Sequence, residues 1–163
     1  MALVAPLFLD TSVMVAGTID FGITSVAPMR LLDAIAAEEI AVPTTSWHCC
    51  LEFYAVTTRL PAEYRLSPSD AHQILEEDVL ERWTVCDLPK EGRQSFLRGL
   101  VRDRVVGGRL YDAHIAEIAR SVGTRTVITE NSRHFTTLMR DGIRVLGAAE
   151  VVADPDFPTG GAS

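Results

Sequence analysis

The sequence predicts an α/β fold, a three-layer α/β/α sandwich with a central, mostly parallel sheet. Short apolar runs alternate with amphipathic helical segments along the chain, which is typical of helices packed on both faces of a parallel sheet. The run Leu7–Leu9 lacks polar alternation, which favours a buried central strand. No internal repeat or linker divides the 163 residues. We therefore expect one domain over residues 1–150 and a loose tail, rich in Pro and Gly, over 151–163.

Each expected element has its own local signal. The expected strands are the apolar or β-branched runs Leu7–Leu9, Ile40–Val42, Thr84–Cys86, Thr126–Thr129 and Ile143–Leu146. The expected helices carry apolar side chains at spacings of three or four residues, and candidate caps or prolines mark several of their first turns. They start at Pro28, at Trp47 after Thr44–Ser46 (running to about Leu60), at Pro68 after Ser67, near Phe96 and near Tyr111.

The composition is that of a globular protein, with 47% hydrophobic and 23% charged residues. No apolar run reaches the ~20 residues of a membrane span, and the N-terminus lacks the basic and apolar segments of a secretory signal. We therefore expect a cytoplasmic protein with no membrane partner. Cys49, Cys50 and Cys86 are odd in number and lack zinc-site spacing, so we expect reduced thiols, mostly buried.

The net charge of −7 does not favour non-specific binding to long nucleic acids, which usually requires a basic surface. All of the 15 basic residues except Lys90 are arginines. Five of them are close in sequence: Arg93, Arg98, Arg102, Arg104 and Arg109. This segment is either a local positive face or a solvated helix face.

Oxygen-bearing side chains occur where two expected strands end and where a helix begins. Asp10 follows the first strand and Asn131 follows Thr126–Thr129, while Asp112 lies in the first turn of a helix. The carboxyl ends of parallel strands form one crevice, which Glu52 would reach from its own helix. Structural roles are also open: Asp10 as an N-cap, Glu52 as a solvated helix residue and Asp112 as a partner of the helix dipole.

A cluster of three carboxylates and an amide oxygen has a definite chemical use. Mg²⁺ prefers such oxygen ligands and retains several waters, and Mn²⁺ is the expected substitute. The ion activates water and offsets charge on a phosphate, which is how metal nucleases cut phosphodiesters. Without a metal, Asp10, Glu52 and Asp112 would repel one another. The arginine-rich segment, together with Arg133 and His134, would hold the substrate.

Four sequence blocks, in this order, resemble those of PIN-domain ribonucleases and, more narrowly, the VapC toxins of bacterial toxin–antitoxin pairs. They are Phe8–Ser12, Leu51–Tyr54 with Arg59–Leu60, Gly108–Ala116 and Thr129–Phe135. The resemblance spans the chain from about Leu7 to Leu146. It implies a PIN-like sandwich, metal-dependent endoribonuclease activity, a cognate antitoxin that blocks the site, and commonly a toxin homodimer.

The resemblance also assigns site residues. Asp10, Glu52 and Asp112 match the family's three acidic positions, and these three are the expected metal ligands. Many relatives have a fourth acidic residue where this chain has Asn131, which offers a carbonyl oxygen or holds a water but carries no negative charge. The neighbouring Glu130 would point to the opposite side of an extended segment, so it is not expected to replace the missing carboxylate.

Four further residues are expected to support the site or contact the substrate. Thr11 and Ser12 would either hydrogen-bond to the site or cap the following helix. Arg109 and Arg133 would contact RNA.

A hydrophobic groove near 29–32 and 53–56 is the expected docking place for an amphipathic antitoxin helix.

Two other functions remain open from the sequence. Aspartyl-phosphate phosphatases also begin with an aspartate after a first strand, but they have a second aspartate where this chain has Ser12. The other alternative is a catalytically inactive PIN-like module that binds RNA or protein, with Asn131 marking a decayed site.

Overall fold

The computed structural model describes residues 6–159, and all structural statements below concern that part of the chain. The strands are β1 (Leu7–Leu9), β2 (Thr44–Ser46), β3 (Thr84–Cys86), β4 (Thr126–Ile128) and β5 (Arg144–Leu146). They pair in parallel in the order β3-β2-β1-β4-β5, so β1 lies at the centre of the sheet. The predicted fold class is confirmed, including the central position of the first strand.

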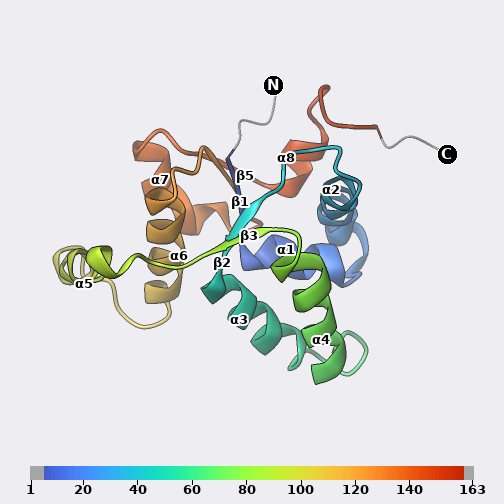
Figure 1. The fold of residues 1–163 in the computed structure, drawn as a ribbon, viewed down its shortest axis with the longest axis horizontal. Helices are drawn as coiled ribbons and strands as arrows, with labels where there is room; N and C mark the ends of the chain where they lie inside the picture. Colours follow the sequence, from blue (N-terminus) through green and yellow to red (C-terminus); the bar gives the residue numbers. More distant parts are fainter. Residues whose placement is uncertain (1–5, 160–163) are drawn as a thin grey trace.

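Helices cover both faces of this sheet (Figure 1). The α-helices are α1 (Thr11–Thr18), α2 (Val26–Ala36), α3 (Trp47–Thr57), α4 (Pro68–Ile74), α5 (Arg93–Arg102), α6 (Arg109–Ser121), α7 (Thr136–Arg140) and α8 (Ala148–Val152). Short turns of other helix types are η1 (Gly22–Ser25), η2 (Leu75–Leu80), η3 (Lys90–Gly92) and η4 (Ser132–Phe135), of which η2 is a π-helix. In Figure 1, α1, α2, α4 and α8 lie on one side of the strands, α6 and α7 lie on the other, and α5 projects outward.

The sheet is apolar on both faces because successive strand residues point to opposite sides. Phe8 and Val127 are paired in register and belong to one buried cluster. Leu9 and Ile128, the next pair, belong to a second cluster with Leu31 of α2. The uninterrupted apolar run of β1 is thus explained by burial on both faces.

The predicted strand Ile40–Val42 is wrong: the strand is β2, four residues further on. Val42 is 60% exposed, whereas Thr45 is fully buried. A polar strand is tolerated here because its hydroxyl groups find partners: Thr45 Oγ1 donates to the Leu9 carbonyl at 2.8 Å. Ser46 also has its predicted capping role, since its Oγ accepts from the Cys49 amide at 3.0 Å.

The C-terminal segment differs from the loose tail predicted for 151–163. Helix α8 runs across position 150, and Val151 is buried. Phe157 is also buried, with the guanidinium of Arg30 5.6 Å from its ring centroid. Burial of these two apolar side chains fixes the segment against α2, while 160–163 lie outside the described residues. The three cysteines are free; Cys49 and Cys50 are buried and Cys86 partly buried.

Within 6–159, no single helix is long and apolar enough to cross a membrane. One bent pair, Thr11–Thr18 with Gly22–Ala36, meets the length and composition criterion only when the two are taken together across a bend of 119°.

Helices α3 and α6 are joined by a hydrogen bond between two imidazoles. The Nδ1 atoms of His48 and His114 are 3.1 Å apart, so one ring donates and the other accepts. The ring of Phe96 on α5 packs against His114, with centroids 5.5 Å apart. Burial lowers the pKa of His114, and the nearby His48 lowers it further.

This lowered pKa predicts a pH-dependent stability. The folded protein binds a proton at His114 less readily than the unfolded chain, so the unfolding free energy decreases as the pH falls below the ordinary histidine pKa of about 6.5. We expect the wild type to lose more unfolding free energy between about pH 7.5 and 5.5 than His114→Asn, measured by urea denaturation. His72→Asn, at an exposed position on α4, controls for the loss of a histidine. Equal pH slopes for the wild type and His114→Asn would contradict this prediction.

Candidate active site

Asp10 lies at the carboxyl end of the central strand, and its carboxylate is held by two hydroxyl groups. Ser12 Oγ donates to Asp10 Oδ2 at 2.7 Å, and Thr129 Oγ1 donates to the same oxygen at 2.8 Å. Asp10 occupies the N-cap position of α1 but makes no side-chain capping bond. The Asp10 carboxylate is therefore oriented by these two hydroxyl donors and not by capping the helix, and Asp10 is only 5% exposed.

Glu52 reaches the same edge of the sheet from α3. Thr11 Oγ1 donates to Glu52 Oε2 at 2.6 Å, which links the start of α1 to the middle of α3. The alternatives for Thr11 and Ser12 thus resolve in favour of hydrogen bonding to acidic side chains, because neither hydroxyl caps a helix.

Asp112 lies in the first turn of α6 and is paired with a histidine. His134 Nδ1 is 3.1 Å from Asp112 Oδ2. Burial raises the pKa of Asp112, while the neighbouring imidazole of His134 acts to lower it; the negative charge of Asp10 adds to the rise. Asp10 and Asp112 line the same cavity, so their carboxylates share one local environment.

One cavity of about 320 Å³ collects the predicted acidic residues. Its polar lining consists of Asp10, Thr11, Ser12, Glu52, Asp112 and Asn131. The apolar part of the lining comes from α1, α3 and the turn after α1, through Val15, Ala16, Val56 and Phe21. The structure therefore brings together all four residues predicted as catalytic.

The segment after β4 contains a supporting residue that the sequence analysis missed. Thr129 is fully buried. Besides donating to Asp10, its hydroxyl accepts a hydrogen bond from the backbone N–H of Asn131 at 3.0 Å. Glu130 points elsewhere, as predicted, because its Oε1 accepts from the Ala148 amide at the start of α8, at 2.9 Å. A hydroxyl directly after the strand that neighbours β1 is the signal that identifies Thr129 in retrospect.

The two arginines predicted to contact substrate are exposed and do not line the cavity. Arg109 is three residues before Asp112 on α6, and Arg133 is next to His134 in η4. Both are therefore close in sequence to residues of the acidic site but are not part of the cavity lining. His134, which the sequence analysis considered only as a substrate contact, is the side chain that touches an acidic residue.

The donor set fits a hard divalent cation bound partly through water. Every candidate ligand is an oxygen, and the hydrogen bonds and ion pair above engage one carboxylate oxygen each of Asp10, Glu52 and Asp112. Within 6–159, no three His, Cys, Asp or Glu side chains stand close enough to form a ready-made metal cluster. Mg²⁺ prefers oxygen ligands and commonly uses only one or two carboxylates plus waters, which these side chains can supply.

Comparison with known proteins relates the chain to one family. No protein-family model matches it. Ribonuclease VapC27 of Mycobacterium tuberculosis is 31% identical over 102 residues, covering 63% of this chain and 72% of that protein. Ribonuclease VapC40 of the same species is 29% identical over 136 residues, covering 83% of this chain and 94% of the relative.

Solved structures share the fold. The sarcin–ricin loop cleaving toxin VapC20 of Mycobacterium tuberculosis superimposes with a TM-score of 0.61 at 18% identity, over 80% of this chain and 94% of that chain. The DNA-bound VapBC of Salmonella typhimurium gives a TM-score of 0.59 at 21% identity, over 89% of this chain and 99% of that chain. With the sequence identity to VapC27 and an acidic cavity at the carboxyl edge of a parallel sheet, the chain belongs to the VapC family of PIN-domain ribonuclease toxins.

Proposed function

We propose that this protein is a metal-dependent endoribonuclease that acts in the cytoplasm as the toxin of a toxin–antitoxin pair. The observation that carries the proposal is the convergence of Asp10, Glu52 and Asp112 on one cavity, from three separate elements of a VapC-family chain. The relatives VapC27 and VapC40 are named ribonucleases, and VapC20 is described as cleaving the sarcin–ricin loop.

In this proposal the chain's own residues orient the ligands and the substrate. Ser12 and Thr129 fix the plane of the Asp10 carboxylate, and Thr11 fixes Glu52. Bound Mg²⁺ or Mn²⁺ supplies a Lewis acid that activates water and offsets charge on the scissile phosphate. Asp10 and Asp112 would hold the ion, with Glu52 as the third carboxylate, and Asn131 would either bind a water or coordinate through its carbonyl oxygen.

Positive side chains close in sequence to the acidic site would hold the RNA backbone. Arg109 is exposed one helical turn before Asp112 on α6, Arg133 is exposed in η4, and His134 is within hydrogen-bonding distance of Asp112. Guanidinium groups bind phosphate oxygens in a forked geometry, which makes these arginines suitable for orienting a flexible single strand.

Removing any of the three carboxylates should abolish RNA cleavage. We expect Asp10→Asn, Glu52→Gln and Asp112→Asn each to reduce cleavage of a cellular RNA preparation, with Mg²⁺ or Mn²⁺ present, by at least about 100-fold. EDTA should have the same effect on the wild type. Glu130→Gln is the matched control, because this neighbouring carboxylate faces α8 and an amide oxygen can still accept the Ala148 bond.

Full activity in any of the three variants would contradict the proposal. The alternative of an inactive PIN-like module predicts a different result: a folded wild type that neither cleaves RNA nor is stabilised by Mn²⁺ in thermal unfolding. Binding of Mn²⁺ without cleavage would instead show that the RNA preparation lacks the substrate, and a wider set of RNAs would then be tested.

We further propose that an antitoxin docks in a second cavity, of about 720 Å³, between α1, α2, α3 and η2. Leu32 and Phe53 line it, so it includes one residue from each of the ranges 29–32 and 53–56 where the docking groove was expected. Its acidic lining residues are Asp33, Glu38, Asp78 and Glu81. An amphipathic segment that carries both apolar and basic side chains fits this lining.

Charge reversal in this groove should weaken antitoxin binding. We expect Asp33→Lys to raise the dissociation constant about tenfold, because a basic antitoxin side chain would then face a lysine. The binding partner would be the product of a small reading frame found beside the gene, and the measurement is interferometry with the purified pair. Glu63→Lys, exposed and outside the groove, is the control. Unchanged binding of Asp33→Lys would rule out this docking site.

We also propose that two copies associate through the outer face of α3. Trp47, Leu51 and Tyr54 form one stripe on this helix and are 45%, 54% and 39% exposed. Sedimentation should therefore detect a dimer for the wild type, and Leu51→Glu should shift the protein towards monomer because a charge would be buried in the interface. A wild type that remains monomeric at high concentration would exclude this dimer.

A further inference from the structure

The helices that carry Glu52 and Asp112 also carry the two hydrogen-bonded histidines. His48 lies four residues before Glu52 on α3, one helical turn away. His114 lies two residues after Asp112 on α6. The 3.1 Å contact between their Nδ1 atoms therefore spans the two helices close to both acidic residues.

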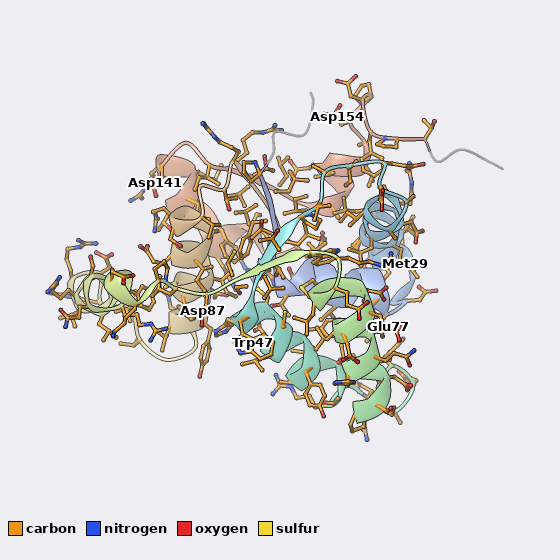
Figure 2. All side chains as sticks on the ribbon, in the orientation of Figure 1. Met29, Trp47, Glu77, Asp87, Asp141 and Asp154 are labelled. Carbon is orange, nitrogen blue, oxygen red and sulfur yellow. The ribbon has the colours of Figure 1, made fainter. Side chains whose placement is uncertain are left out.

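Aromatic contacts fix the orientation of both rings. The Tyr111 ring is tilted against His48 with centroids 5.4 Å apart, and the two imidazoles meet edge to face at 5.2 Å. Phe96 of α5 packs on the other imidazole, that of His114. In Figure 2 the labelled Trp47 marks the start of α3, directly before His48 in the chain. Both imidazoles are partly buried, which limits competition from water for their hydrogen bond.

Apart from the contact between Asp112 and His134, the first turn of α6 is preceded by a segment with little structure of its own. The segment 103–108 has no regular secondary structure, and Gly107 adopts a φ of +59°. A Cβ placed on Gly107 or Gly108 would meet nothing within 4 Å, so this part of the chain is open. The apolar anchors of α6, such as Ile115 and Ile118, begin only after Asp112.

We propose that His48 and His114 are positioning residues for the active site. Their hydrogen bond sets the separation between α3 and the first turn of α6, and hence the distance across which Glu52 and Asp112 face the same ion. This inference rests on the proposed metal-dependent function. Neither histidine lines the acidic cavity, so their contribution is made through the two carboxylates.

The test compares His48→Ala with His48→Asn. Alanine removes the hydrogen bond, whereas the asparagine amide can place a polar atom near the position of Nδ1 and restore it. Mn²⁺ affinity is measured by calorimetry, kcat and KM are measured on RNA, and thermal unfolding monitors the fold. His72→Ala, at an exposed position on α4, is the matched control for losing a histidine.

For His48→Ala we expect Mn²⁺ affinity and kcat to fall about tenfold with little change in KM, and His48→Asn to recover most of both. Asp112→Asn should lose more than His48→Ala in both measurements. In a double-mutant cycle, His48→Ala with His114→Ala should cost no more than the larger single loss, because both remove the same bond.

Three results would overturn the inference. Wild-type Mn²⁺ affinity and kcat in His48→Ala would exclude a positioning role. Equal losses in His48→Ala and His48→Asn, tracking a lowered melting temperature, would show that the histidine is only structural. Additive losses in the double mutant would show that the two rings act separately. Failure of the nuclease proposal is distinguishable, because a wild type that binds Mn²⁺ but cleaves no RNA still allows the His48 variants to be compared by calorimetry.

Discussion

Parallel pairing of β1 with β2 and β4 is the constraint on which the rest of this structure depends. All five strands point the same way, so every strand ends at one edge, where Asp10 after β1 meets the hydroxyl of Thr129 after β4. Burial of Phe8 and Leu9 on opposite faces fixes that register, because a shift by one residue would turn each side chain to the wrong face. The position of the acidic cavity therefore follows from the packing of the sheet.

The cavity combines opposing electrostatic requirements. Carboxylates that share a site repel one another, and the repulsion between Asp10 and Asp112 contributes to the raised pKa of the latter. Hydroxyl donors and His134 stabilise the charged groups in the absence of a cation. A divalent ion would offset the repulsion between the carboxylates. The same residues would thus be stabilised by hydrogen bonds without the ion and by coordination with it. The His48–His114 hydrogen bond is proposed to support the same site, because it joins α3 and α6, the helices that carry Glu52 and Asp112.

Elements with a local sequence signal were predicted correctly, whereas features that depend on tertiary partners were not. Apolar runs identified β1 and β4, and the order of the acidic blocks identified Asp10, Glu52 and Asp112, which the structure brings to one cavity. Strand β2 was misplaced because Thr44–Ser46 is polar, and its burial depends on a carbonyl of β1 that sequence cannot locate. The His48–His114 contact joins residues 66 positions apart, and nothing in either local pattern signals it.

We propose that Asp10 and Asp112 hold a divalent cation at the carboxyl edge of the sheet. The most direct measurement is anomalous diffraction from crystals of the wild type and of Asp10→Asn grown with Mn²⁺. We expect an anomalous peak in the acidic cavity of the wild type, at a position where carboxylate oxygens and waters coordinate the ion. This peak should be absent from Asp10→Asn. A peak outside this cavity, or one that persists unchanged in Asp10→Asn, would contradict it.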